Sequence, residues 1–191
     1  MSESLNTKEK ILECARDLIQ TRSFNSFSYK DLAEALNIRK ASVHYHFPSK
    51  TDLGVAILQD YRKYIQKLMS DLDARTDDPW KKIKSYFWYF SNIMKSGDRI
   101  CTECVLTAEY NTLPEVMQVE LQGLFDDHHS WLSEVLEDGR KKNLLKFKGT
   151  PGDKAIMIKA TVQGALMVAR AFGKPVFFQN VLEQLEEELR V

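Results

Sequence analysis

The sequence predicts an all-α protein built from an N-terminal three-helix domain of the helix-turn-helix type and a larger C-terminal helical domain. Apolar residues recur at the three- and four-residue spacing of an amphipathic helix along most of the chain. Between these stretches stand Ser-x-x-Asp start signals, prolines, and Gly or Asn residues that end helices. We place the domain boundary after residue 48, so that the two predicted domains span residues 1–48 and 49–191.

The first two predicted helices each show one apolar face. Over residues 6–24 this face consists of Ile11, Leu12, Ala15, Leu18 and Ile19. The second helix starts after Ser28, because a serine hydroxyl can cap a free backbone N–H and Asp31 can reach back to the cap. Its apolar face consists of Tyr29, Leu32, Ala33 and Leu36. Asn37 is expected to end it in the left-handed conformation, which asparagine tolerates.

The third predicted helix is unusually short. It begins near Lys40 and must end before Pro48, because a proline pushes the residue before it out of helical geometry. That leaves room for about two turns. Ser49 and Asp52 then repeat the Ser-x-x-Asp pattern and predict the start of the next helix.

The second and third helices together predict a DNA-reading unit. Residues 37–50 include several basic side chains and no Asp or Glu, and their short helix suits the major groove. We expect residues 39–44 to meet base edges and residues 45–50 to contact phosphates. The candidate DNA-binding residues are Ser28, Arg39, Lys40, Ala41, Ser42, His44, Tyr45, His46 and Lys50. The alternative is a basic, solvated corner of an ordinary helical domain.

In order and spacing, the first helix, the Asp31-Leu-Ala turn and the run Tyr-His-Phe-Pro-Ser-Lys over residues 45–50 resemble the N-terminal domain of the TetR family of transcriptional regulators. The resemblance implies a DNA-binding domain over residues 1–48 and a helical ligand-binding and dimerisation domain over residues 49–191. The family often has Gly where Ser23 and Asn37 stand. Further departures at Ala41 and His44 leave the base preference open.

Composition narrows the class of protein. The formal net charge of the 191 residues is +0, so a DNA-binding role depends on local clustering of charge and not on the bulk balance. The chain has no apolar run of membrane-spanning length and no signal peptide at its polar N-terminus, from which we expect a cytoplasmic protein. Three cysteines, an odd number, argue against a disulfide scaffold.

The remaining elements are all predicted helices. A long helix follows Ser49, a loop spans residues 75–79, and the next helix starts near Trp80 and stops near residues 96–97. A shorter helix covers residues 103–110, and a break at 111–114 leads into a long helix with Gly139 close to its end. The last two helices span roughly residues 153–172 and 175–190. The first carries small residues and the second a wide apolar stripe, which together predict a two-fold homodimer on a palindromic operator. An intramolecular core is the alternative.

The aromatic and Met residues of the middle helices suit a hydrophobic small molecule, although for any one of them an ordinary core position is the preferred interpretation. The resemblance implies an inducer pocket in this region. The candidate ligand-binding residues are Trp80, Phe87, Phe90, Met94, Cys101, Cys104, Tyr110, Met117, Phe125 and Trp131.

Cys101 and Cys104 form a C-x-x-C pair at the start of a predicted helix. A zinc site would need two more ligands, and the adjacent His128 and His129 point in different directions, so we expect no metal and no cofactor. The two thiols are either structural or part of an electrophile or oxidant sensor. Residues 101–109 also resemble the corresponding region of the electrophile-responsive branch of the TetR family.

We therefore expect a regulator, in the first instance a repressor, that leaves its operator on binding a small hydrophobic or electrophilic inducer. The alternative is a helical-bundle protein that binds small molecules or senses redox state without affinity for DNA. No nucleophile–base set, Gly-rich phosphate loop or HExxH motif is present, so we expect no enzyme and assign no catalytic residue. The sequence leaves repressor against activator open.

Overall fold

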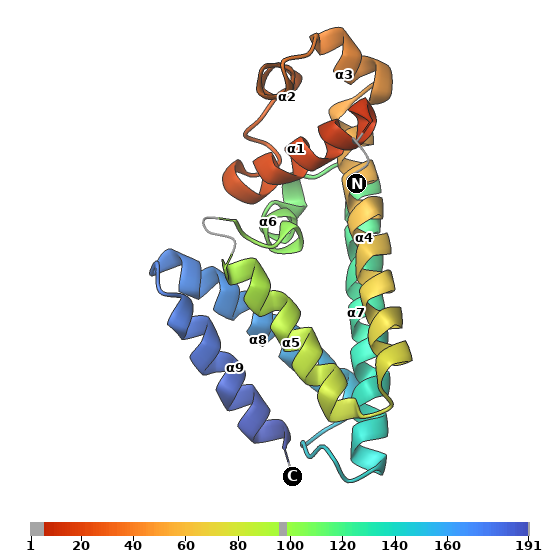
Figure 1. Ribbon diagram of the computed structural model, residues 1–191, viewed down its shortest axis with the longest axis vertical. Helices are drawn as coiled ribbons and strands as arrows, with labels where there is room; N and C mark the ends of the chain where they lie inside the picture. Colours follow the sequence, from red (N-terminus) through yellow and green to blue (C-terminus); the bar gives the residue numbers. More distant parts are fainter. Residues whose placement is uncertain (1–5, 96–98, 191) are drawn as a thin grey trace. The chain divides into compact units, whose positions relative to one another are not determined.

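The computed structural model describes residues 6–95 and 99–190, and this part of the chain is helical apart from short connections (Figure 1). Its elements are α1 (Thr7–Arg22), α2 (Tyr29–Leu36), α3 (Lys40–His46), α4 (Lys50–Arg75), α5 (Pro79–Lys95), α6 (Thr102–Ala108), the 3-10 helix η1 (Tyr110–Thr112), α7 (Glu115–Lys141), α8 (Pro151–Ala171) and α9 (Pro175–Leu189). The all-α prediction is confirmed. The predicted stop at residues 96–97 lies outside the described residues.

The predicted signals around α2 are confirmed atom by atom. The Ser28 hydroxyl accepts a hydrogen bond from the Lys30 N–H at 3.2 Å, and the Asp31 carboxylate accepts one from the Ser28 N–H at 2.7 Å. The Ser28 hydroxyl also donates to the Asp31 carboxylate at 2.6 Å, and this hydrogen bond, followed by the one from the Ser28 N–H, lowers the pKa of Asp31. At the other end Asn37 adopts the left-handed conformation, with φ 51° and ψ 46°, and the Ile38 N–H then reaches the Ala33 carbonyl at 2.9 Å. This pattern closes the helix and turns the chain toward α3.

The third helix is as short as Pro48 requires. It holds seven residues, and Phe47 leaves helical geometry directly before the proline. The Ser49 hydroxyl then accepts a hydrogen bond from the Asp52 N–H at 3.1 Å, and the Asp52 carboxylate accepts one from the Ser49 N–H at 2.9 Å. This second reciprocal cap starts α4.

The chain forms two compact units. The first unit comprises the residues up to Lys63 together with Cys101–Gln122, and the second comprises Tyr64–Ile100 and the residues from Gly123 onward. Both α4 and α7 therefore contribute one end to each unit. The boundary after residue 48, which separates the DNA-binding segment from the rest, stays a prediction.

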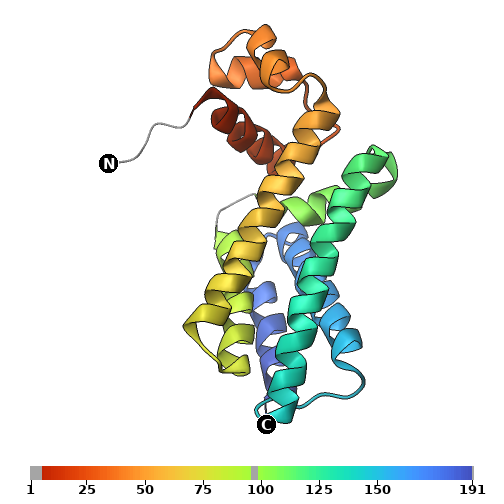
Figure 2. The same ribbon diagram turned by 90° about the vertical axis from the view of Figure 1, so that its right-hand side faces the viewer.

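In the first unit, α1, α2 and α3 cluster around one apolar core (Figure 2). The predicted apolar faces supply it, and α3 adds one fully buried side chain. The core includes Ile11, Ala15, Ile19, Phe24, Phe27, Leu32, Val43 and Phe47. Burial of this kind holds a seven-residue helix that would be unstable alone.

In the second unit, α8 and α9 lie side by side as a hairpin and pack on α5 (Figure 1). The α5 contribution is aromatic: Tyr86 lies with its ring centroid 5.0 Å from that of Phe90 and 5.8 Å from that of Trp131. Among the described helices, none combines the length and apolar character that a membrane span needs.

Candidate functional site

One side of α3 is open to solvent and the other is buried. Val43 and Phe47 point into the core of the first unit, whereas Tyr45 is 85% exposed. Five further candidate DNA-binding residues are exposed: Ser28 before α2, and Arg39, Lys40, Ala41 and His44. Ser42 and His46 are half-buried. The helix thus presents most of the predicted base-reading residues on one accessible surface.

This surface carries positive charge without a compensating acid. Neither Arg39 nor Lys40 forms an ion pair with a described residue, and residues 37–50 contain no Asp or Glu. Arg39 caps α3 without a side-chain hydrogen bond, so its guanidinium is not used to end the helix. Such a surface attracts a phosphate backbone even though the whole chain is neutral.

The position of α3 is set by Tyr29 of α2. The Tyr29 hydroxyl lies 2.9 Å from the Phe47 carbonyl oxygen and 2.5 Å from the Ser49 carbonyl oxygen, on either side of Pro48. Burial, assisted by the Asp52 carboxylate, raises the pKa of Tyr29 to about 12, so the phenol remains a donor at neutral pH. These two hydrogen bonds from the Tyr29 hydroxyl therefore hold the turn between α3 and α4.

Tyr29 also positions His44. The two rings meet edge to face with centroids 4.7 Å apart, and His44 Nδ1 lies 3.3 Å from the Pro48 carbonyl oxygen. His44 is exposed but held, which reduces the entropy lost when such a side chain meets a ligand.

Lys50 points inward rather than to solvent. Its ammonium donates a hydrogen bond to the Phe27 carbonyl oxygen and lies 4.8 Å and 4.4 Å from the ring centroids of Phe24 and Phe27. Burial lowers the pKa of Lys50, while the carboxylates of Glu109 and Asp31 act in the opposite direction. Its phosphate contact stays a prediction, and in this geometry the ammonium instead holds the loop between α1 and α2.

The same loop is held by a residue that the sequence did not single out. The Glu109 carboxylate, at the end of α6, accepts hydrogen bonds from the N–H groups of Phe24 at 2.7 Å and Asn25 at 3.1 Å. The Asn25 side chain donates to the Thr112 hydroxyl at 2.8 Å. No sequence signal links residues this far apart, so only the fold reveals the connection.

The candidate ligand-binding residues fall into both units. Cys101, Cys104, Met117 and the half-exposed Tyr110 belong to the first unit. Phe87, Phe90 and Trp131 are buried in the second unit, where Trp80, Met94 and Phe125 are half-buried. Most of these side chains serve as core, as their helical spacing also allows, and their binding role stays a prediction.

Both thiols of the C-x-x-C pair are buried. Cys101 is 1% exposed, with its sulfur 3.3 Å from the Tyr61 hydroxyl, and Cys104 is 4% exposed. Burial, followed by the charges of Asp17 and Glu13, raises the pKa of the half-buried Cys14. The folded chain therefore shields Cys101 and Cys104 from reagents in solution and partly shields Cys14.

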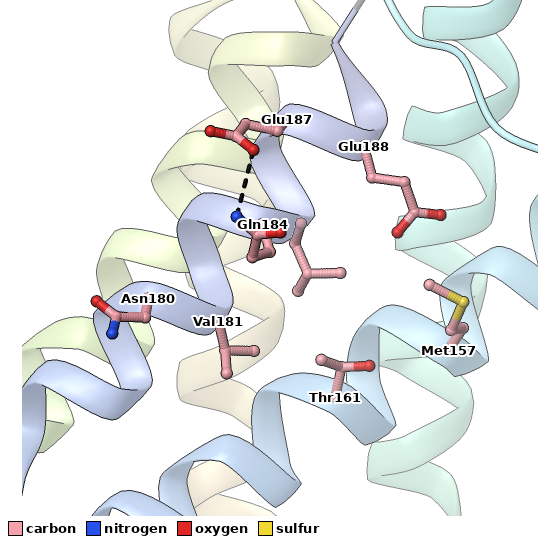
Figure 3. A pocket seen from close by; sticks show the side chains of 8 residues that line it. Met157, Thr161, Asn180, Val181, Gln184, Glu187 and Glu188 are labelled. Carbon is pink, nitrogen blue, oxygen red and sulfur yellow. Dashed lines mark hydrogen bonds between the residues drawn. The ribbon is translucent and has the colours of Figure 1, made fainter.

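A groove of about 700 Å³ runs between α8 and α9. Figure 3 shows Thr161 of α8 and Val181 of α9 facing the space between the helices, with Asn180 and Gln184 on the α9 side. Apolar side chains stand exposed on the same two helices and their connection, namely Ile156, Met157, Met167, Val168, Phe172 and Val176. Several exposed apolar side chains on one pair of helices are typical of an interface.

Comparisons with known proteins agree with this arrangement. The family model described as "Bacterial regulatory proteins, tetR family" matches residues 11–57, which include most of α1 and the whole of α2 and α3. The chain is 28% identical to the HTH-type transcriptional repressor NemR of Escherichia coli (strain K12) over 168 residues, covering 86% of this chain and 84% of NemR.

Two solved structures extend the similarity over the full fold. A TetR-family transcriptional regulator from Agrobacterium tumefaciens matches with a TM-score of 0.92 at 33% identity, covering 96% of this chain and 97% of that one. A TetR transcriptional regulator from Legionella pneumophila matches with a TM-score of 0.90 at 31% identity, covering 99% and 100%. The exposed basic helix α3, its support by α2 and these relatives lead to one conclusion: the chain belongs to the TetR family of DNA-binding transcriptional regulators.

Proposed function

We propose that this regulator is a homodimeric repressor that reads a palindromic operator with α3 and is released from it by a small hydrophobic or electrophilic ligand. The observation that carries the proposal is the exposed, acid-free surface of α3, held in place by Tyr29. The repressor assignment follows the name of NemR, a transcriptional repressor that is similar over most of the chain.

The DNA contact follows from which side chains α3 exposes. Arg39 and Lys40 at its start can reach base edges and phosphates, and Ala41 is small enough to allow close approach. Tyr45 projects from the helix into solvent, and its hydroxyl can contact a phosphate of the DNA backbone. Base preference is then expected to depend on residues 39–44 and overall affinity on Tyr45 and His46.

A dimer is supported by the apolar surface of α8 and α9. Met167, Val168 and Phe172 are between 46% and 64% exposed, which is unfavourable for a chain that stays alone in water. The groove beside Thr161 and Val181 leaves room for side chains of a second copy. Two copies supply two reading helices, which a palindromic operator requires.

A route for ligand control lies inside the first unit. α6 is tied to α1 by the Gln20 amide, which donates to the Thr102 hydroxyl at 3.2 Å, and to the loop before α2 by Glu109. A ligand that displaces α6 would therefore move the loop on which α2 and α3 depend. Such a ligand shifts the balance between the arrangements with α6 in place and with α6 displaced only as far as its affinities for the two differ. An electrophile would in addition need Cys101 or Cys104 to become accessible.

The double variant Arg39→Ala, Tyr45→Ala tests the DNA contact. We expect its affinity for the upstream region of its own gene to fall by about tenfold or more in a gel shift at fixed salt, because both a cation and a backbone contact are lost. The wild-type complex should weaken steeply as salt rises.

The matched control is Lys81→Ala, Trp88→Ala, which removes an exposed cation and an exposed aromatic ring from α5 instead. It should bind DNA as the wild type does. Unchanged affinity in the α3 variant would exclude α3 as the reading helix.

A further inference from the structure

His44 lies on the same face of α3 as Ala41 and Tyr45. It follows Ala41 by three residues and Tyr45 follows by four, so the three side chains are neighbours on one side of the helix. All three are exposed, whereas Val43 and Phe47 point into the core. A DNA groove that receives this helix therefore meets the small Ala41 and, one turn later, the His44 imidazole.

The hydrogen bond of His44 determines which of its ring nitrogens carries the proton. Nδ1 lies 3.3 Å from the Pro48 carbonyl oxygen. A carbonyl oxygen can only accept a hydrogen bond, so Nδ1 is the protonated nitrogen in this contact. In a neutral imidazole the other nitrogen, Nε2, is then unprotonated and can only accept. Toward a ligand, the neutral His44 ring is therefore an acceptor.

The acceptor atom of His44 is available and the ring that carries it is held. No described residue forms a hydrogen bond with Nε2. The two nitrogens lie at opposite edges of the imidazole, so Nε2 faces away from Pro48. The buried Tyr29 ring supports the imidazole edge to face, with the two ring centroids 4.7 Å apart. A side chain held in this way loses little entropy when Nε2 meets a donor.

The groups that DNA presents to such an acceptor are few. In the major groove the exocyclic amines of adenine and cytosine donate hydrogen bonds, whereas guanine N7 and O6 and thymine O4 only accept. Phosphate oxygens also only accept, so the neutral imidazole gains no hydrogen bond from the backbone through Nε2. The available nitrogen of His44 therefore matches a base amine and neither a phosphate nor a guanine edge.

We propose that His44 determines base specificity: its Nε2 accepts a hydrogen bond from the exocyclic amine of an adenine or a cytosine in the operator. The Pro48 carbonyl and the Tyr29 ring are the positioning groups that keep Nε2 an acceptor and hold it in place. The proposal rests on the proposed function in one respect, namely that α3 lies in the major groove. It adds the chemical identity of the base that one operator position holds.

The tautomer is tested on the full chain without DNA. Proton–nitrogen correlation spectra of the isotope-labelled protein, recorded at about pH 8 where neutral imidazole predominates, distinguish the protonated ring nitrogen from the unprotonated one. We expect the proton of His44 on Nδ1. The exposed His129 of α7 serves as the reference in the same spectra. A proton on Nε2 of His44 would overturn the proposal whatever the protein does with DNA.

The base contact is tested on duplexes that the wild-type protein selects from a random pool. One position of the selected sequence is expected to hold adenine or cytosine. An analogue without the exocyclic amine, purine for adenine or 2-pyrimidinone for cytosine, should weaken wild-type binding about tenfold in a gel shift at fixed salt. The same analogue should leave the affinity of His44→Ala unchanged, because that variant has no acceptor to lose its donor.

Two further variants complete the design. His44→Arg presents donors only and should change the selected base at that position to guanine. It provides the test if His44→Ala fails to fold by circular dichroism. His129→Ala removes an exposed imidazole from α7 and should select the same sequence as the wild type.

The DNA results separate this proposal from the proposed function. A sequence that is the same for the wild type and His44→Ala contradicts the role of His44 alone. An equal loss of affinity for every duplex in His44→Ala also contradicts it, since that is the result of a backbone or folding role. A wild-type protein that selects no duplex contradicts the proposed function, and the base contact with it.

Discussion

Ser23 ends α1 in a backbone conformation that side chains rarely adopt, with φ 87° and ψ 161°. This region is essentially restricted to glycine, because a Cβ atom crowds the neighbouring backbone. Ser23 is partly compensated, since its hydroxyl lies 2.8 Å from that of Ser26. The resemblance to TetR-family sequences, which often have Gly here, thus has a local physical reason.

Ser23→Gly is therefore expected to raise the free energy of unfolding by about 1 kcal/mol, since strain of about 1–3 kcal/mol is relieved against the extra flexibility of glycine in the unfolded chain. Urea denaturation measures the change. Ser26→Ala is the control, because it removes the same hydroxyl contact without altering the strained residue, and it should be neutral or slightly destabilising. A less stable Ser23→Gly variant would show that the serine is favourable where it stands.

His128 is a buried imidazole at 1% exposure, with Nδ1 3.2 Å from the Tyr86 hydroxyl of α5 and Lys159 of α8 as its neighbouring cation. Burial and that cation lower its pKa well below the ordinary value of 6.5. The unfolded chain takes up a proton near pH 6.5, whereas the folded chain does so only at much lower pH. Acid therefore favours the unfolded state through this group.

His128→Asn tests this linkage. The stabilisation from neutral His128 is complete above pH 6.5 and is lost as the pH falls toward the lowered value, by up to about 1.4 kcal/mol per pH unit. Urea denaturation between neutral and mildly acidic pH should show a weaker pH dependence in His128→Asn than in the wild type. His129→Asn changes the exposed neighbour on the same helix and should keep the wild-type dependence. Parallel curves for all three proteins would contradict a lowered pKa.

At the scale of elements, the helix-turn-helix could be predicted almost completely because its signals are local. The cap at Ser28 needs Asp31 three residues away, the stop at Asn37 needs its own left-handed backbone, and Pro48 alone limits α3. Each of these effects acts within one helical turn. The sequence contains all the information that such short-range interactions use.

The site residues that depend on distant neighbours could not be predicted in this way. The phosphate contact of Lys50 stays a prediction, but the ring faces of Phe24 and Phe27 and the Phe27 carbonyl that its ammonium meets lie before α2 and α3, two helices earlier in the chain. Helical spacing identifies which face is apolar, and not which element that face meets.

The link between the end of α6 and the loop between α1 and α2 is a second feature that arises only from packing. The Glu109 carboxylate accepts two backbone N–H groups of the α1–α2 loop, and hydrogen bonds to a charged group are worth about 1.5–3 kcal/mol. Glu109→Ala should therefore free this loop. We expect hydrogen exchange at the Phe24 and Asn25 amides to become at least about tenfold faster, as measured by NMR.

Glu115→Ala is the control for this experiment, because Glu115 is an exposed acid at the start of α7. It should leave both amides as slow as in the wild type. Slow exchange that persists in Glu109→Ala would mean that other contacts, such as the Lys50 ammonium on Phe27, hold the loop without the carboxylate.

At the scale of the whole molecule, the net charge of the chain bears on how strongly a single copy can bind DNA. The formal net charge is +0, so positive charge on α3 is offset elsewhere in the chain, and non-specific attraction to DNA is limited. We therefore expect affinity to come from two copies acting on one operator, as in the proposed function. In the proposed dimer, operator affinity would depend on the apolar surface of α8 and α9 as much as on α3.

Gly164 lies in the middle of α8, where glycine is about 0.5–1 kcal/mol less favourable than alanine. A Cβ atom added there would meet no heavy atom within 4 Å, so packing within the chain does not require a glycine. We therefore attribute this exposed glycine to the close approach of another helix. In the proposed dimer that helix belongs to the second copy.

Gly164→Trp should therefore leave each chain folded and prevent the two copies from meeting. The indole extends into open space in the single chain but fills the position that a partner helix would occupy, so we expect the dimer dissociation constant to rise by about tenfold or more in sedimentation experiments. Operator affinity should fall in parallel, because one reading helix cannot span two half-sites. Ser70→Trp places the same ring on an exposed position of α4 and should remain dimeric. A Gly164→Trp protein that stays dimeric with wild-type affinity would move the interface away from this face of α8.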